Sequence, residues 1–394
     1  SSPPLQDLIF LGTASSYPSP HRCASGLIVR FHADGDCWLF DCGESIQVQL
    51  MRSPVKLGRI SRIFITHLHG DHSFGLPGLI STLGGGRCEA GSVLTVCGPP
   101  GTRQFLRQSL AYARSDLVGI RLAIRELAGV PLLMPAPENA QMEAILAAVA
   151  SDSRQGLLPA LPYEIDIADA DRQPDGTWTV VSDQEAAAAS GGVTVQAAAL
   201  SHRVPCVGYR LATRAPATGH LQPELAYQLG LARSGESALL GELKRGRTVT
   251  TRSGAVIRPE QVTAAPPPPL RLAVFGDTCN SDLAADMCRG VDCVVHEATG
   301  DNSLTDSCLE KGHSTPAMAA QFARQVGAKC LLLTHFSQRY TDGAGPTVSD
   351  ASVELLRRQA EAALDGSGID LRMAADLRQF AVTHEGVKFV ADHG

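Results

Sequence analysis

The apolar positions of the chain fall into short runs that are separated by polar and glycine-containing segments. Runs of this length that are rich in β-branched and aromatic residues predict strands. The predicted strands cover residues 8–12, 26–31, 37–41, 62–66, 193–200, 270–275, 293–296 and 330–334. Segments with helical character lie between several of them. This alternation of strands and helices predicts the α/β class.

Two long stretches lack this pattern. Between residues 130 and 190 Pro, Ala, Asp and Gln dominate, and loops of this length are uncommon inside compact domains. We therefore predict a weakly structured, variable insertion over 130–190 without a catalytic role. A second polar stretch runs from 214 to 265 and is closed by the stiff run of prolines at 266–269. We expect both stretches to belong to a single domain that spans residues 1–394.

The composition is that of an ordinary globular protein, with 44% hydrophobic and 19% charged residues in a chain of 394. No apolar run approaches the roughly 20 residues that a membrane-spanning helix needs, so we expect no membrane partner. The net charge of -6 argues against a general nucleic-acid coat but leaves room for a local basic patch. The 11 cysteines form no C-x-x-C pair, which favours reduced thiols over a disulfide framework or a thiolate zinc site.

The amino-terminal end leaves the compartment open. The chain begins Ser1-Ser2-Pro3-Pro4 rather than with methionine, as it would after removal of a transit peptide or after an arbitrary cut. The sequence is therefore compatible with the cytoplasm or nucleus. It is equally compatible with a mitochondrion or chloroplast if a transit peptide has been removed.

The run from Thr66 to His72 carries the densest chemistry of the chain. It places His67, His69, Asp71 and His72 within six residues, directly after the predicted strand at 62–66. Glycine and proline then interrupt the chain before an apolar segment that we predict to be a helix. The three imidazoles and the carboxylate therefore lie in a tight turn at the carboxyl end of a strand, where open α/β sheets bind ligands. This H-x-H-x-D-H arrangement predicts a metal site.

Four more chemical groups follow predicted strands. They are His202, Asp277, Glu297 and His335. His67, His69 and His202 can serve one metal, Asp71, His72 and His335 can serve a second, and Asp277 can bridge the two. Imidazole and carboxylate ligands without sulfur suit Zn²⁺, with Mn²⁺ as a substitute. Two ions that share a water would support hydrolysis by a bound hydroxide.

One further histidine has a different setting. His313 precedes Ser314, Thr315 and Pro316, a sequence in which Thr315 or Ser314 can cap a helix that begins at the proline. His313 is not needed to complete either metal set, so it could donate a proton to a leaving oxygen. Glu297 could orient His313 by a hydrogen bond.

Taken together, these motifs resemble a known family. The chain is similar to the metallo-β-lactamase-fold hydrolases and, among them, to the short-form tRNase Z endonucleases. The matching stretches span most of the chain outside 130–190 and include residues 10–13, 39–44, 66–78, 201–205, 275–278, 296–299, 313–315 and 333–340. The His-Glu-Ala-Thr run at 296–299 and the His-Ser-Thr run at 313–315 set this family apart from lactonases and β-lactamases with the same metal motif.

The resemblance implies a fold, an activity and a set of site residues. The fold would be an αββα sandwich of two mixed sheets with helices outside. The activity would be zinc-dependent removal of the 3′ trailer from precursor tRNA, leaving a 3′-hydroxyl, by attack of a metal-bound hydroxide. Two Zn²⁺ per subunit would be held by His67, His69, Asp71, His72, His202, Asp277 and His335. Asp71, Glu297 and His313 would be catalytic, and the enzyme would be a homodimer without a nucleotide cofactor.

The family also implies a protruding arm that binds tRNA, here over residues 214–262. Between 233 and 258 the chain has six Lys or Arg residues against two Glu, a local charge of +4, as phosphate binding requires. We expect RNA contacts from Arg22, Arg233, Lys244, Arg245 and Arg247. The arm departs from the family pattern, because it lacks the usual Gly-Pro pair and has Glu242 where lysine is common. The loop at 18–23 keeps Arg22 but lacks the lysine and asparagine of many bacterial members.

Two other functions remain open at this stage. A binuclear site alone does not select its substrate, so the chain could be a phosphodiesterase or lactonase that acts on small molecules. Loss of tRNA cleavage on deletion of 220–245, with small-substrate hydrolysis retained, would separate these activities. The chain could also be a non-catalytic tRNA-binding relative, although its metal-ligand set is intact.

Overall fold

The structure is a computed structural model that describes residues 6–86, 91–134, 141, 144–145, 158–188, 192–215, 218–266, 268–341 and 352–394. The chain forms two compact units. The main unit comprises residues 1–212 and 271–394, and the small unit comprises residues 213–270. None of the described helices is long and apolar enough to cross a bilayer.

The first sheet of the main unit has nine strands in the order β18-β17-β1-β2-β3-β4-β5-β6-β7. Pairing is antiparallel from β18 to β3 and parallel from β3 to β7. Its strands are β1 (Gln6–Gly12), β2 (Gly26–Phe31), β3 (Cys37–Phe40), β4 (Ile60–Phe64), β5 (Ser92–Gly98), β6 (Ile120–Glu126), β7 (Glu164–Ile165), β17 (Arg378–Thr383) and β18 (Gly386–Asp392). The sheet is therefore mixed.

The second sheet has seven strands in the order β16-β15-β14-β13-β10-β9-β8. The strands β13 to β16 are parallel, whereas β10 runs antiparallel to β13 and β8 antiparallel to β9. Its strands are β8 (Thr177–Val181), β9 (Val193–Leu200), β10 (Cys206–Thr213), β13 (Arg271–Phe275), β14 (Cys293–Glu297), β15 (Cys330–Thr334) and β16 (Asp370–Met373). This sheet is also mixed.

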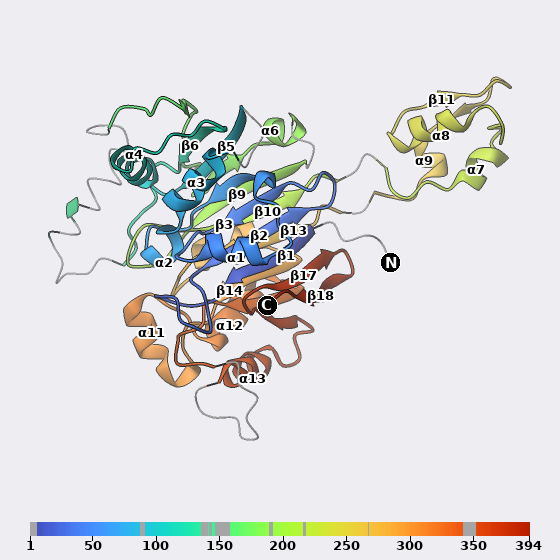
Figure 1. Ribbon diagram of the computed structural model, residues 1–394. Coiled ribbons are helices and arrows are strands. Elements are labelled where there is room, and N and C mark those ends of the chain that lie inside the picture. Colours follow the sequence, from blue (N-terminus) through green and yellow to red (C-terminus); the bar gives the residue numbers. More distant parts are fainter. Residues whose placement is uncertain are drawn as a thin grey trace. The chain divides into compact units, whose positions relative to one another are not determined.

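The two sheets pack face to face and helices cover their outer faces (Figure 1). Between the sheets, Tyr209 of β10 contacts the rings of Phe40 and Phe64, and its hydroxyl donates to the Ile65 carbonyl at 2.7 Å. The first sheet is covered by α1 (Ile46–Arg52), α3 (Leu76–Gly84) and α4 (Thr102–Tyr112), and the second by α10 (Ala285–Cys288), α12 (Pro316–Val326) and α13 (Val353–Leu364). The predicted αββα sandwich is confirmed.

The remaining helices in the described part of the main unit are short. They are α2 (Gly70–Ser73), α6 (Asp183–Ala188) and α11 (Thr305–Lys311), with 3₁₀ turns at Leu57–Arg59, Asp282–Ala284 and Asn302–Leu304. Two of them matter for the site, because α2 carries part of the histidine motif and α11 ends at Lys311, two residues before His313. The predicted helix after Pro316 is confirmed as α12, with Pro316 in its first turn.

The weak structure predicted for 130–190 is wrong for the part that the structure describes. Residues 158–188 contain β7, β8 and α6. Strand β8 extends the second sheet, and its Trp178 is fully buried and donates from its indole to the Ala128 carbonyl at 2.8 Å. The run Thr177–Val181 is β-branched and aromatic, but its strand state depends on pairing with β9. Residues 135–140, 142–143, 146–157 and 189–191 lie outside the described part.

The small unit has its own core. It contains α7 (Pro223–Gln228), α8 (Ser237–Lys244), the two-stranded sheet of β11 (Val249–Thr250) and β12 (Val256–Ile257), and α9 (Pro259–Val262). Its buried apolar side chains are Ala226, Leu231, Leu243, Val249, Ile257 and Val262. This small cluster is separate from the cores of the main unit. That residues 214–262 act as a protruding arm stays a prediction.

Candidate metal centre

The histidine motif lies where sequence analysis placed it. Strand β4 ends at Phe64, and His67 follows in the turn, fully buried. His69 is the residue before α2, and the single turn of that helix carries Asp71 and His72. Because the turn winds back on itself, side chains that are close in sequence point into one buried volume instead of alternating across a strand. The turn therefore supplies four polar groups to one place.

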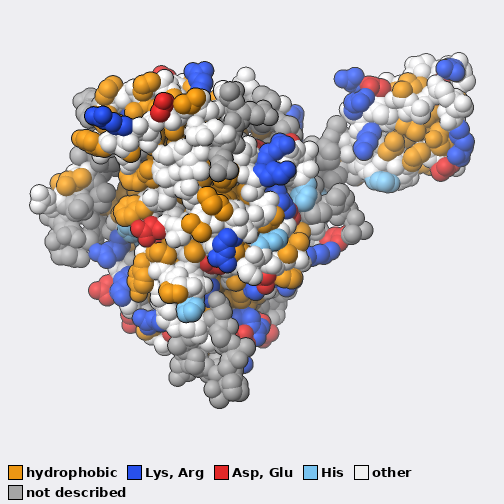
Figure 2. All heavy atoms as spheres, in the orientation of Figure 1, with side chains coloured by type: hydrophobic (Ala, Val, Ile, Leu, Met, Phe, Trp, Pro, Cys, Tyr) orange, Lys and Arg blue, Asp and Glu red, His pale blue; other side chains and the backbone are white. Residues whose placement is uncertain are grey.

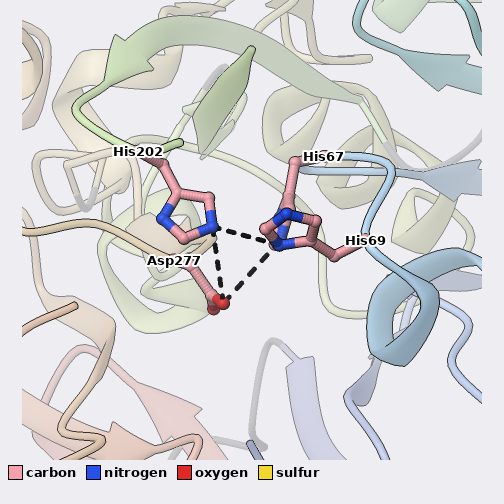
Figure 3. A group of neighbouring side chains, drawn as sticks. All are labelled: His67, His69, His202 and Asp277. Carbon is pink, nitrogen blue, oxygen red and sulfur yellow. Dashed lines mark hydrogen bonds and ion pairs between the residues drawn. The ribbon is translucent and has the colours of Figure 1, made fainter. Parts of the chain in front are cut away.

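Three imidazoles of this region converge with one carboxylate (Figure 3). The Nδ1 atom of His69 lies 3.1 Å from His67 Nε2 and 3.2 Å from His202 Nε2. The Oδ2 atom of Asp277 lies 3.7 Å from His67 Nε2 and 3.9 Å from His202 Nε2. His202 follows β9 and Asp277 follows β13, so three separate segments of the chain meet here. We refer to these four residues as the first donor set.

A second donor set lies on the other side of Asp277. The Nε2 atoms of His72 and His335 are 3.2 Å apart, and each lies 3.3 Å from Asp277 Oδ1. The Oδ2 atom of Asp71 is 3.5 Å from His72 Nε2 and 3.3 Å from His335 Nε2. Asp277 therefore directs one carboxylate oxygen to each donor set. That Asp277 bridges two metal ions stays a prediction.

The donor atoms fit a transition metal ion. Tetrahedral ligands with Zn–N distances of about 2.0–2.1 Å lie about 3.3 Å apart, close to the nitrogen–nitrogen distances of 3.1 to 3.2 Å within the two sets. The atoms of each set lie within 4.8 Å of one another. Nitrogen and oxygen donors without sulfur suit Zn²⁺ or Mn²⁺. The residues present could therefore hold a metal ion in each set.

The electrostatics of the cluster also favour a cation. Burial, reinforced by the His72 imidazole, holds the pKa of His67 well below its usual range, and burial with His202 lowers the pKa of His69 to about 4. Both rings therefore present lone pairs at neutral pH, as ligation requires. Burial opposes a charge on His72, but the carboxylates of Asp277 and Asp71 outweigh it and raise the pKa of His72 well above the usual value. Positive charge is thus stabilised between the carboxylates.

The ring nitrogens that face away from the centre have partners of their own. His72 Nδ1 donates to Asp41 Oδ2 at 2.7 Å, and His202 Nδ1 donates to the Gly312 carbonyl at 2.8 Å. Asp41 also accepts from the backbone N–H of Thr66 at 2.8 Å, and it adopts a left-handed φ of 59°. Such outer contacts fix the tautomer of a ligand histidine. Sequence analysis treated Asp41 only as a strand end, and its position directly after an apolar strand was the available signal.

Glu297 and His313 form the contact expected from the sequence. Glu297 ends β14, and its Oε1 accepts from His313 Nδ1 at 3.0 Å and from the Thr278 N–H at 2.9 Å. His313 lies between α11 and α12 and is also 3.7 Å from Asp277 Oδ2. Burial lowers the pKa of His313, but the Glu297 carboxylate outweighs burial and raises that pKa to about 9. The pair therefore holds a proton next to the donor sets.

The predicted RNA-binding residue Arg22 is largely buried. Its guanidinium donates to Thr13 Oγ1 at 2.8 Å and lies 5.2 Å from the centre of the Phe336 ring. Arg22 lines a surface cavity of about 640 Å³ together with His21 and Tyr340. Arg22 thus lies in the wall of a cavity. Sequence analysis predicted that it contacts RNA. That contact stays a prediction.

The other four predicted RNA-binding residues belong to the small unit. Arg233 pairs with Glu224, and Arg245 and Arg247 both pair with Glu242. Lys244 is the last residue of α8 and is exposed. On the side of the small unit that Figure 2 shows, basic side chains lie around an apolar area. Glu242 stands where the family commonly has lysine. It therefore forms ion pairs with two of the arginines that we expect to contact phosphate.

Comparison with known proteins identifies relatives over nearly the whole chain. A family model described as "Anti-Pycsar protein Apyc1" matches residues 6–83. The chain is 36% identical over 364 residues to zinc phosphodiesterase ELAC protein 1 of Mus musculus, covering 91% of this chain and 94% of that protein. It is 32% identical over 376 residues to ribonuclease Z of Brevibacillus brevis, covering 95% and 96% of the two chains.

A solved structure agrees with these sequence relationships. The crystal structure of the short form of human tRNase Z matches with a TM-score of 0.58 and 27% identity, over 96% of this chain and 99% of that chain. The chain therefore belongs to the ribonuclease Z family of zinc phosphodiesterases, which have the metallo-β-lactamase fold.

Proposed function

We propose that the protein is a zinc-dependent endoribonuclease that removes the 3′ trailer from precursor tRNA and leaves a 3′-hydroxyl. The observation that carries this proposal is the pair of donor sets that share Asp277, in a chain with ribonuclease Z relatives of 32 to 36% identity. His67, His69 and His202 would hold one Zn²⁺ and Asp71, His72 and His335 would hold the second, with Asp277 placed to contribute to both sites. Mn²⁺ can substitute, because the donors are nitrogen and oxygen.

When bound, the two ions supply an activated water and positive charge at the scissile phosphate. The residues of the chain set the geometry for this chemistry. Asp277 directs one carboxylate oxygen to each donor set, and the outer contacts of His72 and His202 engage Nδ1 of each ring, so that Nε2 faces the centre. Hydrolysis at this site would form a bond from the water oxygen to phosphorus and break the bond from phosphorus to the 3′ oxygen of the tRNA.

His313 provides the proton for the leaving 3′ oxygen. Its Nδ1–H donates to Glu297, so the proton that it can release is on Nε2. Glu297 stays ionised, because burial raises its pKa but the facing His313 outweighs burial and lowers it. The carboxylate therefore orients the ring and favours its charged form. The products are a tRNA with a free 3′-hydroxyl and a trailer with a 5′-phosphate.

The tRNA is held by basic residues outside the metal centre. Arg233, Lys244, Arg245 and Arg247 contact phosphates when the exposed ion pairs of the small unit open, since such pairs contribute only about 0–1 kcal/mol each. Arg22 contributes from the wall of the cavity at 19–22. By its resemblance to this family the enzyme works as a homodimer, which light scattering of the purified chain would test.

The direct test is cleavage of a precursor tRNA with a 3′ trailer by the purified protein. The protein would be assayed as isolated, after metal stripping and after return of Zn²⁺ or Mn²⁺. We expect one cut next to the discriminator base, loss of the cut after stripping and its return with metal. Cleavage that is unaffected by complete metal removal, or no cleavage by the protein with both metals bound, would contradict the proposal.

A second candidate function is hydrolysis of small phosphodiesters. The names of the ELAC relatives describe a phosphodiesterase, and the family model at 6–83 covers the first histidine motif without any part of the small unit. Deletion of residues 220–245 would separate the two functions. If tRNA is the substrate, this variant loses tRNA cleavage but still hydrolyses a small phosphodiester such as bis(p-nitrophenyl) phosphate. Equal tRNA cleavage by the deletion variant would favour the second function.

A further inference from the structure

The hydroxyl of Thr299 lies between the second donor set and the Glu297–His313 pair. Thr299 Oγ1 is 2.6 Å from Glu297 Oε2 and 3.0 Å from His335 Nδ1. The same oxygen is 3.0 Å from the carbonyl oxygen of His335. Thr299 thus contacts a candidate metal ligand and the carboxylate that orients the proton donor. Nothing in the ligand assignment itself requires a hydroxyl at this position.

The proton positions around Thr299 follow from its neighbours. Glu297 already accepts from the N–H groups of Thr278 and Ser314, and an ionised carboxylate can only accept. The short contact of 2.6 Å is therefore the Thr299 hydroxyl donating to Glu297. The lone pairs of the same oxygen are then free to accept the Nδ1–H of His335. This places the proton of His335 on Nδ1 and the lone pair on Nε2.

That tautomer is the one that the second donor set needs. His335 Nε2 lies 3.2 Å from His72 Nε2 and 3.3 Å from carboxylate oxygens of Asp71 and Asp277. A proton on this nitrogen would prevent ligation. Asp41 is the corresponding partner of His72, but as a carboxylate it can only accept a hydrogen bond. Thr299 both accepts and donates, so it connects the charge of Glu297 to the ring of His335.

The backbone conformation of His335 is a second reason why its side chain needs a contact with Thr299. His335 has a left-handed φ of 60°, a conformation that is unfavourable for a residue with a Cβ. The backbone of Thr299 accepts from the Ser337 N–H at 3.1 Å, and Ala298 donates to the Thr334 carbonyl at 3.0 Å. The segments on either side of Thr299 and His335 are therefore tied together. The hydroxyl holds the imidazole within this fixed frame.

We propose that Thr299 is a positioning residue that fixes the tautomer and orientation of His335 and so joins the second donor set to the Glu297–His313 pair. The inference rests on the proposed function, which assigns His335 as a ligand. Loss of the hydroxyl therefore lowers the affinity for the metal ion held by Asp71, His72 and His335. The ion held by His67, His69 and His202 keeps its affinity, because the partner of His202 is the Gly312 carbonyl.

The experiment measures zinc binding by the full chain in competition with a chromophoric chelator, without RNA. The variants are Thr299→Val, which keeps the shape but removes the hydroxyl, and Thr299→Ser, which restores it. Thr102→Val is the matched control, because Thr102 is fully buried and its hydroxyl donates to the Pro99 carbonyl at 2.7 Å, far from either donor set in the sequence. In addition, the tautomer of His335 is read from ¹⁵N shifts of the imidazole.

In Thr299→Val we expect one of the two zinc ions to bind about 10- to 100-fold more weakly, as after loss of an outer hydrogen bond. Thr299→Ser and Thr102→Val should bind both ions like the parent chain, and His335 should lose its single Nδ1–H tautomer only in Thr299→Val. Parent-like binding by Thr299→Val, or an equal loss in Thr102→Val, would overturn the proposal. Because no RNA is present, this result is independent of whether the chain cleaves tRNA.

Discussion

The metal centre and the small unit differ in how strongly the fold determines their side chains. The donor residues are buried except for the half-buried His69, they come from the ends of strands in both sheets, and each imidazole of the second set has an outer hydrogen-bond partner. In the small unit, Arg233, Arg245 and Arg247 are exposed and form ion pairs with Glu224 or Glu242, and the unit has a core of six side chains. The first region is positioned for chemistry. The second region presents exposed charged side chains that can exchange one ion-pair partner for another.

This difference predicts how each region responds to substitution. In the centre, one altered atom breaks contacts to several neighbours, because buried polar groups depend on one another. In the small unit, each arginine acts mainly through its charge, and its exposed ion pair is weak. Changes in the centre should therefore abolish the reaction, whereas changes in the small unit should weaken substrate binding.

The largest effect is expected for Asp277→Asn. The substitution keeps the shape of the side chain but removes the charge that both donor sets share, so zinc content and the rate of cleavage should fall together, the rate by about 10³-fold or more. Cleavage of precursor tRNA and metal analysis of the same samples measure both. Asp292→Asn is the control, because Asp292 is also buried and hydrogen-bonded but pairs with Lys329. If Asp277→Asn retains both ions and its activity, Asp277 is not the ligand that the two donor sets share.

An intermediate effect is expected for Gly312→Ala. Gly312 has a φ of 79°, and an added Cβ would lie 2.7 Å from His202 Nδ1, which donates to the carbonyl of this same residue. The first donor set should therefore bind zinc about tenfold more weakly or worse. Chelator competition measures this loss.

Gly327→Ala separates crowding from backbone strain. Gly327 has a similar φ of 64°, but an added Cβ would meet no atom within 4 Å. Both variants should lose about 1 kcal/mol of stability from the left-handed conformation, and only Gly312→Ala should lose zinc affinity. A loss of the same size in both variants would show that strain alone accounts for it.

The smallest effect is expected for the double variant Arg245→Ala/Arg247→Ala. The turnover rate should stay near that of the parent, while KM for precursor tRNA rises several-fold. The slope of log affinity against log salt should fall by about two, one for each lost phosphate contact. Arg357→Ala/Arg358→Ala is the control, because these arginines also form exposed ion pairs, with Glu354 on α13. An unchanged salt slope would exclude Arg245 and Arg247 from tRNA binding.

The comparison also explains which parts of the fold and of the site could be predicted from the sequence. Strands such as Val193–Leu200 and Cys330–Thr334 were predicted at their observed limits, because each is a short, mainly apolar run. The donor residues could be found because they follow such runs or share one short motif. The bridging place of Asp277 and the contact of His313 with Glu297 followed from the same reasoning.

Other features depend on contacts between segments that are distant in the sequence. Asp41 meets His72 because the segments that follow the paired strands β3 and β4 lie side by side, and Thr299 meets His335 because β14 and β15 are paired. Strand β8 lies in a polar stretch and becomes a strand by pairing with β9. Local patterns carry no signal for such pairings, so the outer contacts of the centre and the true extent of the second sheet became visible only in three dimensions.

The central claim is that two metal ions lie on either side of the Asp277 carboxylate. Anomalous scattering at the zinc edge from crystals of the zinc-loaded protein tests it most directly. The account predicts two peaks, one among His67, His69 and His202 and the other among Asp71, His72 and His335, with Asp277 between them. A single peak, or zinc bound without Asp277 as a ligand, would contradict it.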